Sequence, residues 1–451
     1  MMDWKTLISN KRLGQEDLHY QRKDDRTEFH RDYDRLIFSA PFRRLQNKTQ
    51  VFPLPGSVFV HNRLTHSLEV ASVGRSLGND VANRLVAIHP ELRESHIGEC
   101  GSIVSAACLA HDLGNPPFGH SGERAIASFF SEGEGQKYKP LMTEAQWNDI
   151  IHYDGNANAF RLLTHQFLGR RPGGFVMTYS TLASIVKYPF TSDLAGEKQK
   201  FGFFQSEADT YARIAKELGI GKKTAGHTGN GGSSTSASYV RYPLVYLVEA
   251  ADDICYEIMD IEDAHKLKII STDETKQLLL GYFTPEHQEN MQKILSKITD
   301  KNEQVVYLRS CAIGALESAC VRVFVENEES ILNGTFEGSL IDHINPILHD
   351  AYRQCERLSF DRIYFSKDVL DIDLAGYKII STLIDLFITA TMNPETAYSK
   401  LLLGRVSSQY DVLNPDVYTR IMAVLDFISG MTDVYSLDLF RKINGDSIPI
   451  I

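Results

Sequence analysis

The chain has 451 residues, of which 43% are hydrophobic and 23% are charged, and its formal net charge is −11. This composition is that of a globular protein with enough apolar residues for a core, and it excludes disordered, collagen-like and low-complexity chains. The length corresponds to about three domains or to one large helical domain with elaborations. The negative charge argues against a surface built wholly for nucleic acid.

The sequence predicts a cytoplasmic protein without a membrane segment. Its best apolar stretch, Leu383 to Thr391, contains Asp385 and is shorter than the roughly 20 residues that a spanning helix needs. The N-terminal residues contain no apolar signal segment. The cysteines are scattered without a CxxC pair, which indicates buried thiols in a reducing compartment rather than disulfides or a zinc site.

Charge is distributed unevenly along the chain. Residues 1–48 hold eleven Lys and Arg against eight Asp and Glu, a net charge of +3, so the rest of the chain carries −14. A basic arm on an acidic body favours a focused contact with a polyanion, such as a phosphate group or the end of a nucleic acid. A solvated arm without a partner explains the same pattern, and both interpretations stay open.

Helical periodicity dominates the first part of the chain. Residues 1–45 are predicted to form the basic arm and a first helix, and a β-hairpin is possible at residues 51–60. Apolar residues at helical spacing predict a helix from Leu64 to Val86. The almost wholly apolar stretch from Gly101 to His111 predicts a central, buried helix that ends where glycine and proline follow.

Beyond this helix, residues 221–238 are rich in Gly, Ser and Thr and are predicted to form a mobile loop, because such residues cannot bury a core. The next long helix is predicted from Pro243 to about His265, with the proline in its first turn. A short strand is expected near residues 362–364. Amphipathic segments predict further helices at 274–283, 286–298, 303–333, 338–357, 366–390, 415–429 and 436–443.

The predicted fold class is therefore all-α, with at most a short β-hairpin. Three segments are expected along the chain: the basic arm with the first helix, a catalytic core, and a C-terminal helical region packed on that core. Their predicted boundaries are 1–45, 46–270 and 271–451.

Histidines are concentrated in one part of the sequence, with eight of the fifteen between residues 61 and 165. Histidine serves both metal ligation and proton transfer near neutral pH. His111 and Asp112 end the predicted buried helix, and a buried carboxylate must be paired or bound to a metal because its isolated burial costs several kcal/mol. A bare His-Asp pair is more often a turn-capping aspartate beside a histidine bound to a backbone carbonyl. His66 follows Arg63 by one helical turn, so both side chains can project from one face.

A second acidic feature lies in the predicted 243–265 helix. Asp252, Tyr256 and Asp260 recur at four-residue spacing and therefore lie along one face. The apolar neighbours indicate that the helix is largely buried, so this acidic stripe is predicted to be internal and to need a partner. Glu249 is predicted to point elsewhere, as an ordinary surface charge.

A histidine, then a His-Asp pair, then a distant aspartate resembles the HD superfamily of metal-dependent phosphohydrolases. The segments RDYDRLIFSAPFRRLQNKTQV, HNRLTHSLEVA, HDLGNPPFGHSGE, YLVEAADDICYEI and DFISGMTD resemble bacterial deoxyguanosine triphosphate triphosphohydrolases. A thinner resemblance connects the chain to the vertebrate SAM-and-HD-domain dNTP triphosphohydrolase, which has a histidine where this chain has Asn115. The resemblance covers nearly the whole chain and implies an HD-domain helical core with additional C-terminal helices.

The resemblance implies that His66, His111, Asp112 and Asp252 hold one divalent metal ion per subunit. Two carboxylates offset the charge of such an ion, and four protein ligands on an octahedral metal leave positions for water and a phosphate oxygen. The family leads us to expect Mn²⁺ or Mg²⁺, while the mixed nitrogen and oxygen ligands also suit Fe²⁺, Ni²⁺ or Zn²⁺.

By the same resemblance His120 is the catalytic histidine and Glu123 its partner. A helix beginning at Ser121 or Gly122 would place His120 just before it and Glu123 in its first turn. A carboxylate that orients an imidazole and favours its charged form makes an acid–base pair. A turn histidine beside a carboxylate that complements the helix dipole is the simpler alternative.

The implied reaction is attack of water on the α-phosphorus of a deoxynucleoside triphosphate, with dGTP preferred, to give the deoxynucleoside and tripolyphosphate. His120 would handle a proton on the attacking water or on the leaving 5′-oxygen, and the sequence leaves both roles open. The chain contains no GxxxxGK[ST] segment, so it is not a Walker-type NTPase.

Substrate contacts are implied as well. Arg63 resembles the family's phosphate-binding arginine, and Gln50 resembles the residue that reads the sugar 3′-hydroxyl with help from Asp260. Tyr256 resembles the tyrosine that packs beneath the deoxyribose and rejects a 2′-hydroxyl. Phosphate, metal-shell or base contacts are implied for Asn156, Lys187, Tyr364 and Lys367.

The family also implies a homo-oligomer, most often a hexamer. Two other functions stay open: a broad dNTP triphosphohydrolase that needs a dNTP activator, and a nucleic-acid-binding regulator with a vestigial HD site. Single-stranded DNA bound by the basic arm is a possible modulator of an active enzyme.

Overall fold

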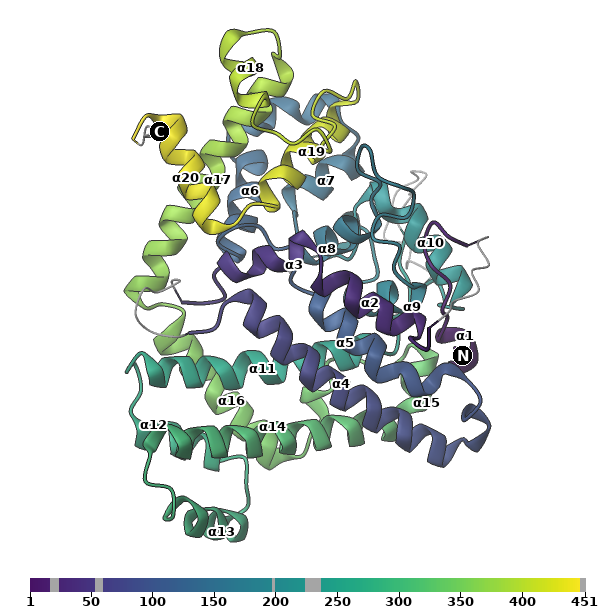
Figure 1. Cartoon of the computed structure of the whole chain (residues 1–451), viewed down its shortest axis with the longest axis vertical. Helices are drawn as coiled ribbons and strands as arrows, with labels where there is room; N and C mark the ends of the chain where they lie inside the picture. Colours follow the sequence, from purple (N-terminus) through teal and green to yellow (C-terminus); the bar gives the residue numbers. More distant parts are fainter. Residues whose placement is uncertain (17–23, 53–59, 197–198, 224–236, 447–451) are drawn as a thin grey trace.

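The computed structural model describes residues 1–16, 24–52, 60–196, 199–223 and 237–446, and 67% of the chain is helical (Figure 1). Within these residues β-structure is limited to isolated bridges, and no sheet forms. The predicted all-α fold class is confirmed.

Three helices form the centre of the fold: α4 (Arg63–Ile88), α5 (Cys100–Ala110) and α11 (Val245–Lys266). Helix α2 (Glu28–Ile37) packs against α5, and α14 (Lys301–Glu326) packs against α4 and α11. Every residue of α5 except Ser102 is buried, as its apolar sequence predicts.

The remaining helices surround this centre, with α18, α19 and α20 at the top of the view and α12, α13 and α14 at the bottom (Figure 1). Their bounds are α1 Trp4–Leu7, α3 Ala40–Arg44, α6 His120–Ser131, α7 Glu144–Ile151, α8 Gly155–Thr164, α9 Tyr179–Ser184, α10 Ala208–Glu217, α12 Thr272–Leu280, α13 Pro285–Leu295, α15 Glu328–Asn333, α16 Pro346–Leu358, α17 Lys367–Met392, α18 Ala397–Leu403, α19 Val417–Ser429 and α20 Asp433–Asn444. Short 3₁₀ turns occupy Leu45–Asn47, Pro90–Leu92, His96–Glu99, Glu134–Leu141, Ser192–Leu194, Gln205–Glu207 and Ile341–His343.

Helices α4 and α5 pack closely and in opposite directions. A Cβ atom at Gly78 would lie 2.7 Å from the Cα atom of Gly101, so this crossing requires glycine. At the N-terminus of α4, Asn62 accepts a hydrogen bond from the Thr65 amide at 3.0 Å, and the Thr65 hydroxyl accepts one from the Asn62 amide at 3.1 Å. This capping box fixes the first turn of α4 beside the end of α5.

Two hydrophobic clusters hold the chain together. The first joins the N-terminal residues with α4, α5, α11, α14 and α16, and the second joins α6 and α7 with α17, α19 and α20. The second cluster therefore unites residues between 125 and 204 with residues between 379 and 439. The clusters do not test the expected boundaries at 45 and 270, which stay a prediction.

Several local expectations differ from the structure. The strand expected near residues 362–364 is wrong, because Ser359–Ile363 forms a π-helical turn that continues from α16. The single helix expected at 303–333 is interrupted at Asn327, which ends α14 and precedes α15. Pro243 lies just before the N-cap residue of α11 rather than within its first turn.

Other expectations fall on positions that the structure does not describe. The possible hairpin at 51–60 lies mostly outside the described residues, and so do residues 224–236 of the predicted loop. Helix α18 was not expected from the sequence.

The described residues contain one stretch, Val369–Met392, that is long and apolar enough to cross a membrane, with a mean hydropathy of 1.3. Half of this stretch is buried within the protein, where α17 packs against α6, α18, α19 and α20. Burial of this kind is what the core helix of a soluble protein shows, so this helix is weak evidence for a membrane span.

A buried ion-pair network links α8 to the C-terminal helices. The Arg161 guanidinium donates to Asp426 at 2.9 and 2.8 Å and to Glu207 at 2.7 Å, and all three side chains are almost completely buried. Burial opposes the charge of Arg161, but the two carboxylates outweigh it and raise the pKa of the guanidinium.

We predict that Arg161→Ala lowers the free energy of unfolding by about 3–5 kcal/mol, because it leaves two buried carboxylates without a counter-charge. Denaturant titration of the purified protein measures this loss. The matched control is Arg353→Ala, whose ion pairs with Asp342 and Glu356 are about 40% exposed and are expected to contribute below about 1 kcal/mol. Equal losses in the two variants would contradict the prediction.

Candidate active site

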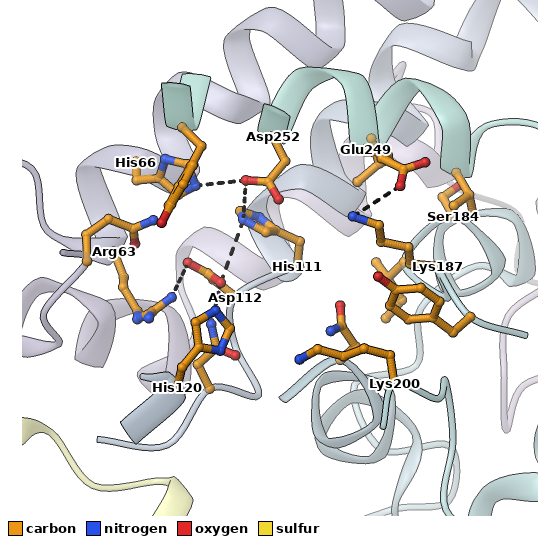
Figure 2. Close-up of a pocket in the computed structure, with 18 of the residues that line it drawn as sticks. Arg63, His66, His111, Asp112, His120, Ser184, Lys187, Lys200, Glu249 and Asp252 are labelled. Carbon is orange, nitrogen blue, oxygen red and sulfur yellow. Dashed lines mark hydrogen bonds and ion pairs between the residues drawn. The ribbon is translucent and has the colours of Figure 1, made fainter. Parts of the chain in front are cut away.

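A cavity of about 230 Å³ lies where α4, α5, α6 and α11 meet (Figure 2). Ser184, Lys187 and Lys200 lie on its opposite wall. Its lining residues are Gln50, Arg63, His66, His111, Asp112, Asn115, His120, Glu123, Asn156, Ser184, Ile185, Lys187, Tyr188, Lys200, Val245, Val248, Glu249, Asp252 and Tyr256.

His66, His111, Asp112 and Asp252 come together on one side of this cavity. His66 lies in the first turn of α4, the His-Asp pair follows the last residue of α5, and Asp252 comes from the middle of α11. The Asp252 Oδ1 atom lies 3.0 Å from His66 Nε2 and 3.4 Å from His111 Nε2. His111 Nε2 lies 3.8 Å from Asp112 Oδ1.

The electrostatics of this group favour a cation. Burial opposes protonation of His111, yet the charges of Asp112 and Asp252 outweigh it and raise the pKa of the imidazole to about 9. Burial also opposes ionisation of Asp252, but the nearby His111 imidazole holds the pKa of this carboxyl well below its usual range. Both carboxyl groups are thus ionised near neutral pH, because the pKa of Asp112 is lowered too.

The arrangement fits a single divalent ion. One ligand atom from each of His66, His111 and Asp112 can be chosen so that all three lie within 4.8 Å of one another. Ligand atoms at about 2.1 Å from an octahedral ion are separated by about 3 to 4.2 Å, and the spacings that Asp252 and Asp112 make with the imidazoles fall in this range. The His111 Nδ1–H donates to the Cys108 carbonyl oxygen at 2.6 Å, which leaves Nε2 directed at the cavity.

His120 and Glu123 form a second group at the edge of the cavity. His120 is the first residue of α6 rather than the residue before it, and its ring is largely exposed. The His120 Nδ1 atom lies 2.7 Å from Glu123 Oε2, while Glu123 Oε1 accepts from the Gly155 amide at 2.7 Å. Burial opposes ionisation of Glu123, but its bond with His120 prevails and lowers the pKa to about 2. The Glu123 carboxylate is therefore ionised near neutral pH.

The sequence-predicted substrate residues divide into two groups. Gln50, Arg63, Asn156, Lys187 and Tyr256 line the cavity. Arg63 donates to Asp112 Oδ2 at 2.7 Å, while its Nε atom and the Gln50 Oε1 atom are buried without a hydrogen-bond partner among the described residues. Lys187 lies 3.1 Å from Glu249.

The other three predicted residues do not line the cavity. Asp260 accepts a hydrogen bond from the Tyr364 hydroxyl at 2.8 Å, and the Tyr364 ring lies 6.2 Å from the ring of Tyr256. The bonded pair of Asp260 and Tyr364 therefore lies next to Tyr256 and outside the cavity. Lys367 is exposed at the start of α17. Substrate contacts by these three residues remain predictions.

Sequence reasoning missed several lining residues. Lys200 lies 3.7 Å from Glu123 and 3.5 Å from Asp154, and no motif in the sequence marks it. Glu249 was expected at the surface, but it lines the cavity, is only 11% exposed and pairs with Lys187 and Arg241. The expectation was wrong because Glu249 precedes Asp252 by three residues, so helical geometry places both side chains on the face of α11 that borders the cavity.

Part of the positive charge of the predicted basic arm is paired with nearby acidic side chains in the described residues. Arg12 pairs with Glu28 and Asp32 in the interior. Lys11, Arg26 and Arg31 also form ion pairs with acidic side chains. Lys48 is buried and bonded to backbone carbonyls. At least four of the nine Lys and Arg side chains described in residues 1–48 are thus paired with carboxylates.

Comparison with known proteins agrees with this geometry. The HD-domain family matches residues 63–145, which contain His66, His111, Asp112 and His120, and the phosphohydrolase-associated domain matches residues 343–442.

The chain is similar over almost its whole length to curated bacterial proteins. A deoxyguanosinetriphosphate triphosphohydrolase-like protein of Pseudomonas aeruginosa is 36% identical, covering 99% of this chain and all of the relative. A protein of Synechocystis sp. with the same description is 35% identical over 99% of this chain and all of the relative. The deoxyguanosinetriphosphate triphosphohydrolase of Yersinia enterocolitica is 27% identical, covering 92% of this chain and 93% of the relative. The resemblance seen in the sequence is thereby confirmed, and the chain belongs to the deoxyguanosinetriphosphate triphosphohydrolase family of HD-domain phosphohydrolases.

Proposed function

We propose that the protein is a metal-dependent dNTP triphosphohydrolase that prefers dGTP and releases the deoxynucleoside and tripolyphosphate. The observation that carries the proposal is the convergence, in one cavity, of a cation-favouring cluster from three helices with the His120–Glu123 pair. Lys187 and Lys200 face this cluster from the opposite wall (Figure 2). A phosphate chain between the two walls would meet positive charge on both sides.

His66, His111, Asp112 and Asp252 would hold the metal. When bound there, a divalent ion supplies Lewis-acid polarisation of an α-phosphate oxygen and offsets the charge that develops on it. The family favours Mn²⁺ or Mg²⁺, and the two imidazoles also accept Fe²⁺, Ni²⁺ or Zn²⁺.

His120 would transfer the proton. Because the ionised Glu123 accepts the Nδ1–H, the opposite ring nitrogen Nε2 is the atom that can reach a water or the leaving 5′-oxygen. The Gly155 amide and Lys200 hold Glu123 in turn, so the imidazole has a defined tautomer and orientation.

The other lining residues would bind the nucleotide. Lys187 stays charged because Glu249 raises the pKa of its ammonium despite burial, which suits contact with phosphate oxygens. Gln50 offers a buried oxygen that has no hydrogen-bond partner among the described residues, as contact with a sugar hydroxyl requires. Tyr256 lies against His66, with ring centroids 6.4 Å apart, and would limit the space next to the deoxyribose.

We expect purified protein with Mn²⁺ to convert dGTP to deoxyguanosine and tripolyphosphate, because the cluster would act at the innermost phosphate. Separation of the products by ion-exchange chromatography tests this. Release of pyrophosphate with the monophosphate, or of orthophosphate with the diphosphate, would contradict the bond assignment. Each dNTP should be assayed alone and in mixtures. Silence with single nucleotides would favour the type that needs a dNTP activator.

Substitutions of Asp112 and of His120 should have different effects on metal binding and on turnover. Asp112→Ala is expected to abolish both Mn²⁺ binding and turnover. His120→Ala should bind Mn²⁺ like the wild type but lose about 10²- to 10⁴-fold in kcat, the usual contribution of a general acid or base. Calorimetric Mn²⁺ titration and initial rates give the two readouts. Full activity of His120→Ala would show that its assigned role is wrong.

Selection of the sugar should depend on Tyr256. Tyr256→Ala is expected to raise the ratio of kcat/KM for GTP over dGTP by about tenfold, since it removes a steric barrier of one to a few kcal/mol. Tyr398→Ala, on the exposed surface of α18, is the matched control and should leave the ratio unchanged. An unaltered ratio in Tyr256→Ala would mean that another residue excludes the 2′-hydroxyl.

A further inference from the structure

The segment DFISGMTD, residues 426–433, is not part of the cavity, although the sequence resemblance singles it out. It spans the end of α19 and the start of α20. Its polar groups contact two segments that border the cavity: the loop 113–119 between Asp112 and His120, and residues 48–49 just before Gln50.

Asp433 makes the central contact. It is only 6% exposed, and its two carboxylate oxygens accept hydrogen bonds from two backbone amides far apart in the chain. Oδ1 accepts from the Phe118 amide at 2.9 Å, and Oδ2 accepts from the Thr49 amide at 2.8 Å. One carboxylate thus joins the loop before His120 to the segment that carries Gln50.

Two buried side chains, those of Lys48 and Asn158, also connect the 113–119 loop to Ser429. The Lys48 ammonium donates to the Asn115 carbonyl oxygen at 2.6 Å and to the Ser429 carbonyl oxygen at 2.8 Å. The Asn158 amide donates to the Gly114 carbonyl oxygen at 2.7 Å and to Ser429 Oγ at 3.2 Å. The 113–119 loop is therefore bound at Gly114, Asn115 and Phe118.

This loop needs external support because its backbone is strained. Phe118 has φ +62°, which is unfavourable for a residue with a side chain, and Gly119 follows with φ +56°. The Phe118 ring packs so closely on α17 that a Cβ atom at Gly376 would lie 2.5 Å from its Cγ atom. Without the bonds that hold it, the loop would relax, and the start of α6 would shift with His120.

We propose that Asp433 is a positioning residue for the reaction. By bonding the Phe118 and Thr49 amides, it holds His120 and Gln50 at fixed positions relative to the proposed metal ligands. This inference rests on the proposed function and extends it, because it assigns the C-terminal helices a part in catalysis. Asp433 acts through other residues and does not line the cavity.

The test is Asp433→Asn. The asparagine side chain has the same shape but only one acceptor oxygen, so its NH₂ group faces one of the two amide donors. We expect kcat for dGTP to fall about 10- to 100-fold, while KM changes less and the Mn²⁺ dissociation constant stays within twofold. Hydrogen exchange should accelerate in residues 113–119 but not in α5.

The matched control is Asp438→Asn, which changes an exposed aspartate on the same helix and should behave like the wild type. A double-mutant cycle distinguishes positioning from general support. If Asp433 acts mainly through His120, adding Asp433→Asn to His120→Ala lowers the residual kcat by much less than the single substitution does. An equal further loss would show that Asp433 does not act through His120, and would overturn the inference.

Should Asp433→Asn fail to fold, Lys48→Met serves instead, because it removes both Nζ bonds while filling a similar volume; the same fall in kcat with unchanged Mn²⁺ binding is expected. If the wild type is active and the variant has the same kcat, this inference is overturned but the proposed function is not. A wild type that hydrolyses no dNTP overturns the proposed function and this inference with it.

Discussion

Two neighbouring carboxylates that must both stay ionised, the buried Asp112 and the half-buried Asp252, are the constraint on which the rest of this structure depends. Asp112 and Asp252 come from different helices, and each would be costly to bury without positive charge nearby. His111 and Arg63 provide that charge within hydrogen-bond distance, and the His66 ring also bonds Asp252. A divalent ion would satisfy the same need more completely, because it can bind both carboxylates and both imidazoles at once.

Helix packing makes this concentration of charge possible. The glycine contact between α4 and α5 lets the two backbones approach, so the first turn of α4 lies beside the end of α5. The polar ends of an otherwise apolar helix pair thus open into the cavity. The apolar residues of α5 lie in the core, whereas His111 and Asp112, which follow its last residue, line the cavity.

The C-terminal helices contribute more than core packing. Asp426 neutralises the buried Arg161 of α8, and Asp433 bonds the loop that precedes His120. Residues far apart in the chain are therefore connected to the loop before His120 through buried hydrogen bonds, which are strong because water does not compete with them. The segment that matches the phosphohydrolase-associated domain thus bonds a loop of the segment that matches the HD domain.

The sequence by itself determined the helical fold class, the helices that carry His66 and Asp252, and the family, because periodicity and local motifs are properties of neighbouring residues. It also brought His120 and Glu123 together, since one helical turn separates them. Only the tertiary structure decided that Lys200 faces the cavity, that Asp260 and Tyr364 bond to each other next to Tyr256, and that Asp433 bonds the loop before His120. The two Asp433 contacts join segments 315 and 384 residues apart, and no local pattern encodes them because they form only when separate helices pack.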